Sequence, residues 1–495
     1  MSRPTDSRGP DSSVEPDPVR WRVLFVLLIA IFMSLVGVSI VNVALPSIQE
    51  GLGASQADLQ WVLSGYALTF GIVLIAAGRA GDLMGRGGIF IIGVGIFTAA
   101  SVASGVAPNA EWLNIARFVQ GVGSGLLSPQ GIGMIQQYFR GAERGRAFGY
   151  FGSVVGVSVG IGPVLGGFLI KLGGVDFGWR LTFLVNVPAG IAAIILALRW
   201  FPKPLMNFGP KGAAGEQSRT MRSLRALDPI GSALAGLAVF AILFPFVEAK
   251  SSALTWLLLL FGLVLVAVWV WWERRYARQG HSPMVDLRLF STRSFANGTI
   301  IVTLYFLGMT SIWVLVALYI QQGLGRSALE SGLIGIPSAL SSALSANWAG
   351  KRVVRYGRKL VIGGLLFALT GLALSILIIL LHANGHLSVW WLLLSLTLIG
   401  VAQGTVISPN QTLTLADVPL HYAGSSGAIM QTGQRIGTSI GIAMITAAVF
   451  AALTVTSWPI AVTAGFILIG LVILSALGMA FKDLHDRAKS SASDE

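Results

Sequence analysis

Long apolar runs alternate with short polar turns along the whole chain. A helix needs about 20 apolar residues to cross a hydrocarbon core that is about 30 Å thick. The pattern predicts an all-α polytopic membrane protein with 14 spans, and the even number puts both chain ends on one side of the membrane. The fourteen runs lie near residues 22–45, 60–77, 89–107, 113–135, 147–170, 181–200, 229–247, 253–272, 297–320, 329–348, 360–381, 389–408, 426–451 and 459–481.

The polar turns contain an internal repeat. Residues 78–88 read GRAGDLMGRGG and residues 350–359 read GKRVVRYGRK, so two glycines and an arginine recur at an offset of 272 residues. At the same offset, residues 51–58 (GLGASQAD) match residues 323–330 (GLGRSALE), and both segments resemble a helix-starting capping box. Two matches at one offset and in one order indicate two copies of one unit.

The repeat predicts two pseudo-symmetric six-helix bundles with two additional helices inserted between them. The two apolar runs between the copies belong to neither, and linkers flank them: residues 202–225, rich in Pro, Gly, Ser and basic residues, and residues 273–293. The expected divisions are a flexible cytoplasmic N-terminal tail (1–20), the N-terminal bundle (21–201), cytoplasmic linkers with the inserted helices (202–294), the C-terminal bundle (295–481) and a cytoplasmic C-terminal tail (482–495).

The basic residues predict the orientation in the membrane. The tails and alternate loops hold 28 of the 34 Lys and Arg residues, whereas the other loops hold only four. Because cytoplasmic loops carry the excess of Lys and Arg, this asymmetry predicts an N-in, C-in topology. The same distribution accounts for the net charge of +13. Charge spread thinly over short loops does not indicate nucleic acid as a partner.

Composition restricts the class of protein further. Hydrophobic residues make up 54% of the chain, charged residues 11%, and the mean hydropathy is +0.76, which excludes a soluble domain. With no cysteine, no P-loop motif and no His/Asp/Glu cluster, we expect no cofactor, no metal site, no ATP hydrolysis and no enzyme activity. The expected setting is a bacterial-type inner (plasma) membrane. The expected partners are the lipid bilayer and a small-molecule substrate, with protons left open, and we expect a monomer.

Several motifs occur in register along the chain. The 78–88 loop carries Gly78, Asp82, Gly85 and Arg86, and the run from Arg117 to Gly123 reads RFVQGVG. Residues 41–46 read VNVALP, and Trp179-Arg180 precedes Asn186-Val-Pro188. A further glycine-rich motif consists of Gly160, Gly162, Pro163, Gly166 and Gly167.

With these motifs the chain resembles the major facilitator superfamily, in its 14-span drug:H+ antiporter branch, along nearly its whole length. The resemblance implies a secondary transporter that works by alternating access, most simply an efflux carrier for small amphipathic compounds or drugs. An importer or exporter of an anionic or zwitterionic metabolite is the alternative. A channel or a membrane-embedded enzyme is disfavoured, since no charged ring and no nucleophile–base arrangement is present.

The loop motif is a candidate conformational latch formed by Gly78, Asp82, Gly85 and Arg86. We expect Asp82 to lie where a helix begins, so that its carboxylate interacts with a positive helix end or with a cytoplasmic arginine. The alternative is a turn whose charges only keep it in water. The second copy has Val354 at the corresponding position, so any latch is one-sided.

The glycine-rich motif predicts close helix packing and a kink. Gly160, Gly162, Gly166 and Gly167 let a neighbouring helix approach, and Pro163 frees a backbone carbonyl and allows a bend. That this kink also seals the protein against ion leak is implied by the family resemblance.

Ionisable residues inside spans are expensive and indicate function. Only Arg117 and Arg435 qualify, and Gln120 lies one turn from Arg117. Backbone carbonyls are the alternative partners of Arg117. The candidate residues lining a central substrate cavity are Asn42, Tyr66, Arg117, Gln120, Tyr305, Trp313, Gln403, Gln434 and Arg435.

The first span departs from the family pattern. Members of the branch typically carry an aspartate before the Ile-Val-Asn sequence, where this chain has Gly37. No other span supplies a deep carboxylate, so the usual proton site is missing. We therefore expect weak proton coupling, or coupling through boundary groups such as Asp82.

Overall fold

The computed structural model describes residues 19–206, 228–247, 253–281 and 283–493. Within these ranges the chain is helical and contains no β-strand. Twelve of the described helices are long and apolar enough to cross a membrane. Two further helices of 29 residues each, α4 and α11, are not apolar enough to be counted with them. Residues 1–18 of the expected N-terminal tail and 207–227 of the expected linker lie outside the described residues.

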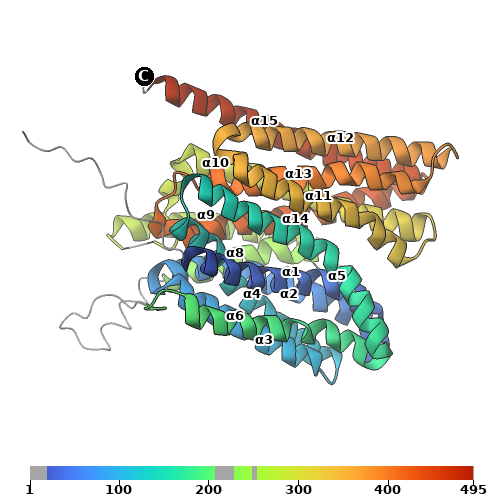
Figure 1. Ribbon diagram of the computed structural model, residues 1–495, viewed down its shortest axis with the longest axis horizontal. Coiled ribbons are helices and arrows are strands. Elements are labelled where there is room, and N and C mark those ends of the chain that lie inside the picture. The colour runs from blue at the N-terminus through green and yellow to red at the C-terminus, as the bar shows by residue number, and fades with distance from the viewer. Residues whose placement is uncertain (1–18, 207–227, 248–252, 282, 494–495) are drawn as a thin grey trace, which may run out of the picture.

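The N-terminal half forms one bundle of six helices, in which α1 packs on α5 and α4 packs on both α2 and α3 (Figure 1). Apolar side chains form its core, with Phe90, Phe97 and Phe148 fully buried. The helices are α1 (Val19–Leu52), α2 (Gln56–Met84), α3 (Arg86–Gly105), α4 (Ala110–Tyr138), α5 (Gly141–Leu184) and α6 (Asn186–Trp200).

The C-terminal half forms a second bundle beside the first (Figure 1). Short helical segments η2 (Tyr319–Gly323), η3 (Val389–Trp391) and η4 (Leu420–Tyr422) connect its main helices. The last helix continues past the expected start of the C-terminal tail at residue 482. The main helices are α10 (Arg293–Leu318), α11 (Ala328–Tyr356), α12 (Arg358–Ala383), α13 (Leu392–Thr414), α14 (Ala423–Leu453) and α15 (Trp458–Ser493).

The internal repeat appears as matched local structure. Ser55 caps α2 and Ser327 caps α11, each in a complete capping box with the acid three residues later. Each of these helices then ends at a glycine with positive φ, 105° at Gly85 and 52° at Gly357. Residues that carry a side chain rarely adopt such φ angles, so glycine is needed at both turns.

The two inserted helices, α8 (Pro229–Val247) and α9 (Ala253–Arg278), form a pair drawn yellow-green in Figure 1. Helix α8 packs on α9, on α2 of the first bundle and on α14 of the second, so it contacts both halves. Helix α9 is mostly exposed, including Leu257, Leu260 and Phe261. An apolar helix with so little protein cover fits a lipid-facing position.

The bundles meet where α2 crosses α14 and where α5 crosses α11. A Cβ atom on Gly78 would lie 2.6 Å from the Gly424 carbonyl oxygen, and one on Gly145 would lie 2.5 Å from that of Gly350. Glycine therefore allows the backbones to touch at both crossings. Both lie toward the end of the molecule that holds the 78–88 and 350–359 turns and the C-terminus (Figure 1).

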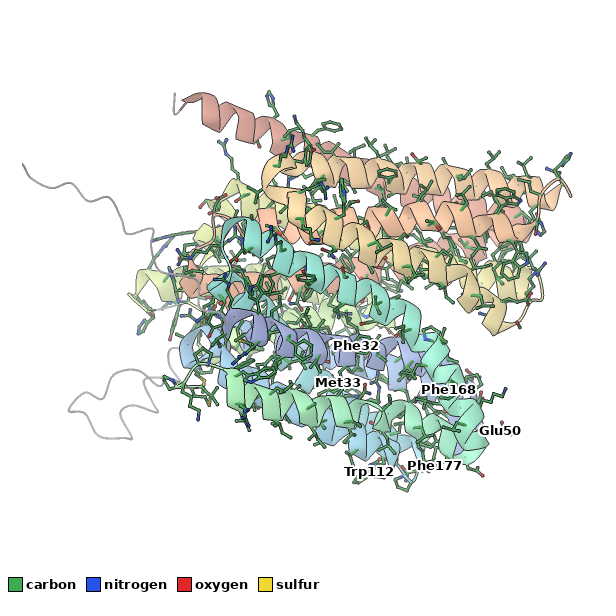
Figure 2. The ribbon with its side chains drawn as sticks, viewed as in Figure 1. Phe32, Met33, Glu50, Trp112, Phe168 and Phe177 are labelled. Atoms are coloured by element: carbon green, nitrogen blue, oxygen red, sulfur yellow. The ribbon has the colours of Figure 1, made fainter. Side chains whose placement is uncertain are left out.

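The opposite end of the N-terminal bundle presents aromatic side chains to its surroundings. Figure 2 shows Trp112, Phe168 and Phe177 there, and all three are exposed. Tryptophan is enriched where membrane and water meet, and exposed apolar side chains suit a lipid environment. The outer surface is thus that of a multi-pass membrane protein.

Candidate functional site

Asp82 joins the two bundles. We expected Asp82 to lie where a helix begins, but it lies in the last turn of α2. The helix start that it faces is that of α14, more than 300 residues later. Its Oδ1 accepts a hydrogen bond of 2.8 Å from the Gly424 amide, and its Oδ2 accepts bonds from the Ser425 amide (2.8 Å) and hydroxyl (2.7 Å). The carboxylate thereby satisfies free N–H groups at a positive helix end.

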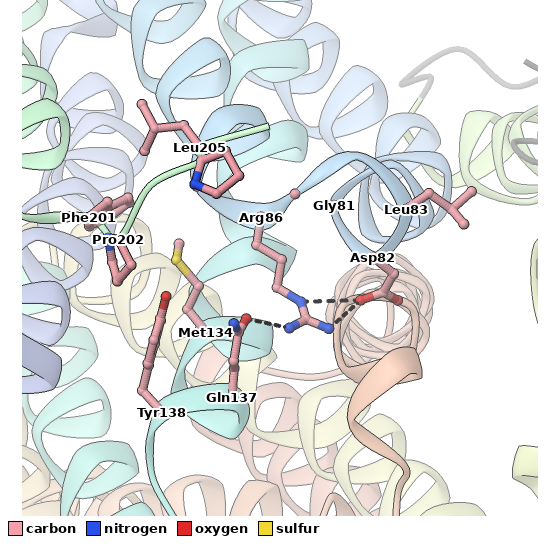
Figure 3. Close-up of a pocket in the computed structure, with 13 residues that line it drawn as sticks. Gly81, Asp82, Leu83, Arg86, Met134, Gln137, Tyr138, Phe201, Pro202 and Leu205 are labelled. Carbon is pink, nitrogen blue, oxygen red and sulfur yellow. Dashed lines mark hydrogen bonds and ion pairs between the residues drawn. The ribbon is translucent and has the colours of Figure 1, made fainter. Parts of the chain in front are cut away.

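Arg86 completes this contact. Its Nη2 lies 2.7 Å from Asp82 Oδ1 and also donates to the Leu420 carbonyl at 2.7 Å. Its Nη1 donates to Gln137 Oε1 at 2.6 Å, as Figure 3 shows. Gly78 supplies the close approach to Gly424 and Gly85 supplies the turn. The four motif residues therefore converge on the crossing of α2 and α14.

The second copy of the turn is arranged differently. Val354, which takes the place of Asp82, is exposed. Arg358, the equivalent of Arg86, turns into its own bundle and pairs with Asp483. The polar positions of the motif are thus arranged differently in the two copies, whereas Gly350, the equivalent of Gly78, also approaches the other bundle, at Gly145.

A central cavity of about 100 Å³ lies between the bundles. Helices α1, α2, α4 and α5 supply one wall, and α10, α13 and α14 supply the other. Of the sequence-predicted residues, Tyr66, Gln434 and Arg435 line it. The complete lining is Ile31, Ser34, Leu35, Val38, Tyr66, Phe70, Leu127, Ser128, Ile132, Phe151, Val155, Phe306, Ile407, Gln411, Gln431, Gln434 and Arg435.

Three hydroxyl groups fix one side of this cavity. Ser124 Oγ lies 2.6 Å from the Tyr66 hydroxyl and 2.7 Å from Ser34 Oγ, and Ser34 lies 3.3 Å from Tyr66. The three groups satisfy one another, so Tyr66 is held by α1 and α4 while its ring faces the cavity. Tyr66 and Phe70 stack with ring centroids 6.1 Å apart.

Arg117 and Gln120, which were expected to line a substrate cavity, are not among the residues that line this one. Arg117 Nε donates to the Val62 carbonyl at 2.8 Å, and Nη1 donates to Gln120 Oε1 at 2.5 Å. Gln120 in turn donates to Ser101 Oγ at 2.8 Å. The guanidinium also lies 4.3 Å from the centre of the Tyr66 ring. With Arg117 only 1% exposed, its partners all come from inside the N-terminal bundle.

Three other residues that the sequence predicted to line the cavity lie on the same helix faces as lining residues, but farther along those helices. Asn42 follows Val38 by four residues on α1, and Gln403 precedes Ile407 by four on α13, so each shares a face with a lining residue. Trp313 follows Phe306 by seven on α10. All three lie beyond the cavity, on the side away from Asp82. Asn42 is exposed there, and the other two are half-buried.

Tyr305 does not lie on a cavity face. Consecutive residues point about 100° apart on a helix, so Phe306 faces the cavity while Tyr305 is buried in the core of the C-terminal bundle. Sequence reasoning missed Ser34, Ser128, Gln411 and Gln431. Helical spacing could have identified one of them, Gln431, as a cavity residue, because it lies three residues before Gln434 on the same helix face.

The glycine motif of α5 serves packing at three of its positions. A Cβ atom on Gly162 would lie 1.8 Å from Ser39 Oγ of α1, and one on Gly160 would lie 2.4 Å from Ala339 Cβ of α11. One on Gly166 would lie 2.9 Å from Ile40 Cγ1, whereas Gly167 has open space around it. The backbone remains helical through Pro163, and the break in α5 is at Gly174, with φ 68°.

Two helical bundles that meet around a cavity with polar groups, inside an apolar outer surface, are typical of a membrane transporter. Among the residues that the structure describes, no group of three or more His, Asp or Glu residues could hold a metal ion. The sequence profile of the Major Facilitator Superfamily matches residues 27–442, and the chain belongs to this family. It is a multi-pass transporter and not an enzyme.

The chain is similar to a probable antibiotic transporter and to a multidrug resistance protein. It is 33% identical over 452 residues to the probable actinorhodin transporter of Streptomyces coelicolor, covering 89% of this chain and 75% of that protein. It is 30% identical over 437 residues to the multidrug resistance protein Stp of Mycobacterium tuberculosis, covering 87% and 76%. The solved structure of the human organic anion transporter MFSD10 superposes with a TM-score of 0.66 at 13% identity, covering 94% and 100%, which shows a shared fold alone.

Proposed function

We propose that the protein is an efflux carrier for small amphipathic compounds, located in the plasma membrane and working by alternating access between its two bundles. The observation that carries this proposal is a cavity between the bundles that contains polar groups in a mainly apolar wall and is closed at one end by the contact of Asp82 with the start of α14. The similarity to a multidrug resistance protein and to a probable actinorhodin transporter supports this direction of transport.

In this proposal the protein crosses the membrane 14 times, with both ends in the cytoplasm. Helices α4 and α11 would then be spans despite their polar residues. Support comes from where those residues lie, since Arg117, Gln120 and Gln130 of α4 and Ser338 and Ser342 of α11 are buried against other helices rather than facing lipid. The concentration of Lys and Arg in the tails and alternate loops supports the orientation.

With this topology the structure is closed toward the cytoplasm. The interbundle hydrogen bonds of Asp82, Arg86, Ser128 and Ser153 all lie in the half of the molecule that contains the basic turns. The cavity of about 100 Å³ is smaller than the roughly 300 Å³ of an ordinary small-molecule site. Substrate binding therefore requires the bundles to separate further around the cavity.

The Asp82 contact would act as a latch for this conformation. Hydrogen bonds to a charged group contribute about 1.5–3 kcal/mol each. Opening toward the cytoplasm must break those to Gly424 and Ser425. Since about 5.5 kcal/mol inverts a 1:99 equilibrium, a latch of this strength is enough to set the balance between two states.

Proton coupling is proposed to be weak or carried by groups outside the cavity, such as Asp82. None of the residues lining the cavity is an acid. A Cβ atom on Gly37 would lie 3.2 Å from Phe97 and 3.5 Å from Asn186, so this position points into the N-terminal bundle rather than into the cavity.

The proposal is tested with purified protein in proteoliposomes, using a fluorescent amphipathic dye as the transported compound. A carrier gives saturable uptake of the dye, and this uptake is accelerated by a non-fluorescent analogue of the dye on the other side of the membrane. A channel gives no such counterflow, and chemical conversion of the dye would reveal an enzyme. Direction follows from comparing inside-out with right-side-out vesicles, and uptake confined to the inward direction would contradict an exporter.

A further inference from the structure

The central cavity contains a cation that the described part of the protein leaves without a counter-ion. The guanidinium of Arg435 lines the cavity and lies 4.3 Å from the centre of the Phe70 ring. It makes no hydrogen bond and no ion pair with any residue that the structure describes. Arg117 and Arg358, in contrast, are bonded inside their own bundles. Arg435 is half-buried and its guanidinium keeps its charge, so it can bind an acceptor supplied by a ligand.

Two amide groups beside Arg435 also lack acceptors. The Nε2 atoms of Gln431 and Gln434 are buried and have no hydrogen-bond partner among the described residues. Ser128 donates to Gln431 Oε1 at 2.7 Å, which directs the amide so that its NH2 group remains unused. Gln431 is only 7% exposed. A buried donor without an acceptor is unfavourable, so these groups too are suited to a ligand that supplies oxygen atoms.

Acceptors are scarce in the same cavity. Gln411 and Gln434 each offer one side-chain oxygen that makes no hydrogen bond with the described residues, whereas the hydroxyls of Ser34, Tyr66 and Ser124 are occupied with one another. No Asp or Glu lines the wall. The cavity thus has an excess of donors and a positive charge, and a cationic ligand would meet repulsion without compensation.

The remaining wall is apolar and aromatic. Tyr66, Phe70, Phe151 and Phe306 line the cavity together with branched aliphatic side chains. Flat aromatic molecules pack well against such rings, either stacked or edge to face. The recognition elements are therefore aromatic faces together with a fork of donors at one end.

We propose that the cavity binds planar aromatic substrates that carry anionic or carbonyl oxygen atoms, and that Arg435, assisted by Gln431 and Gln434, binds those oxygens. This inference rests on the proposed carrier function and specifies its substrate class. The planar fork of Arg435 matches a carboxylate in two parallel hydrogen bonds, which an ammonium group cannot reproduce.

The test compares two dyes with the same tricyclic xanthene ring and opposite charge, the anion fluorescein and the cation rhodamine 123. Binding is measured by fluorescence anisotropy on the purified full-length protein in detergent, with empty micelles as the blank. We expect fluorescein to bind at least about tenfold more tightly than rhodamine 123. Arg435→Gln should weaken fluorescein binding by about tenfold or more and leave rhodamine 123 within about twofold.

A second variant keeps the test decisive if Arg435→Gln fails to fold. Gln431→Glu places a carboxylate beside Arg435 at nearly constant size, and it should weaken fluorescein binding while strengthening rhodamine 123 binding. Lys351→Gln, which removes a positive charge from an exposed turn, is the matched control and should change neither. Tighter binding of rhodamine 123 by the wild type, absence of fluorescein binding, or fluorescein binding unaffected by both cavity variants would overturn the proposal.

Counterflow of the same dyes separates this proposal from the carrier function. If the wild type exchanges rhodamine 123 as readily as fluorescein, the carrier function stands and the substrate class is wrong. If fluorescein binds through Arg435 but undergoes no counterflow, the binding site stands and the carrier function is wrong.

Discussion

Arg358 and Asp483 form a buried ion pair that ties the last helix to the C-terminal bundle, with Arg358 Nε 2.5 Å from Asp483 Oδ2. Arg358 also donates to Asn410, and Asn297 Nδ2 donates to the other carboxylate oxygen at 3.0 Å. Four helices, α10, α12, α13 and α15, are thereby joined by one polar cluster. The equivalent arginine of the first copy, Arg86, instead faces the other bundle.

Replacing Asp483 with Asn should destabilise the protein strongly. The change leaves the Arg358 guanidinium buried without an opposite charge, which costs about 3–5 kcal/mol. We expect a marked fall in the thermal unfolding midpoint in detergent. The matched control is Glu330→Gln, which removes the acid from the exposed Arg326–Glu330 pair while keeping the capping side chain, and should cost less than about 1 kcal/mol. Equal shifts for the two variants would contradict a stabilising role for the buried pair.

Asp82→Asn should shift the protein toward the inward-open state while leaving its abundance near that of the wild type. The amide keeps the size of the side chain but loses the charge that faces the start of α14. The measurement is labelling of Asn42→Cys, exposed on the open side, by an impermeant thiol reagent, and the rate should fall several-fold together with transport.

The control for the latch is Asp58→Asn on the same helix. Among the described residues, Asp58 bonds to the neighbouring Ser55 alone, so its loss should not alter labelling at position 42. Normal labelling and normal transport in Asp82→Asn would reduce the loop motif to a polar turn.

The helices and their ends could be predicted from the sequence because the features that determine them lie close together in the chain. Apolar run length predicted the long helices, and the repeat predicted the glycine turns and the capping boxes. Contacts between distant segments could not be predicted in this way. The partner of Asp82 lies more than 300 residues away, and nothing in the spacing of residues 78–88 indicates α14.

The rotation of each helix about its axis was the other limit. A polar residue in a span predicts a side chain that faces away from lipid. In this fold such a side chain can lie either in the core of its own bundle or in the cavity between the two bundles. Arg117 faces the first and Arg435 faces the second. Both are arginines within three residues of a glutamine in runs predicted to be spans, so composition could not separate them.

Arg117→Lys and Arg435→Lys should therefore differ in what they impair. A lysine at 117 cannot serve both the Val62 carbonyl and Gln120, and we expect a loss of stability of about 1–3 kcal/mol with unchanged dye affinity in the folded fraction. A lysine at 435 should lower fluorescein affinity and leave the unfolding midpoint near the wild-type value. The same pattern of effects in both variants would contradict the assignment of the two arginines to different environments.

The proposed topology predicts the accessibility of single cysteines, which the cysteine-free chain allows to be introduced without background. Arg355→Cys should react with an impermeant reagent only from the cytoplasmic side. Pro108→Cys and His386→Cys should react only from outside. All three positions are exposed, so a lack of reaction on the expected side cannot be attributed to burial. Labelling of position 355 in intact cells would contradict the orientation.

Gly162→Ala and Gly167→Ala test whether the α5 motif acts through helix packing. The added methyl group at 162 would lie 1.8 Å from Ser39 Oγ and 3.2 Å from the Ile40 amide nitrogen, so α1 and α5 must separate. Overpacking of this kind costs about 1–3 kcal/mol. At 167 nothing lies within 4 Å, so alanine should be tolerated or should slightly favour the helix.

The same two variants test whether the α5 glycine motif also prevents ions from leaking through the protein. If close packing of α1 on α5 blocks ion leak, proteoliposomes with Gly162→Ala should collapse a proton gradient faster than those with Gly167→Ala at equal protein density. Ser39→Gly in the Gly162→Ala background removes the nearest clash and should partly restore both stability and tightness. Faster leak in Gly167→Ala, or no leak in a destabilised Gly162→Ala, would separate packing from sealing and leave the motif a structural role alone.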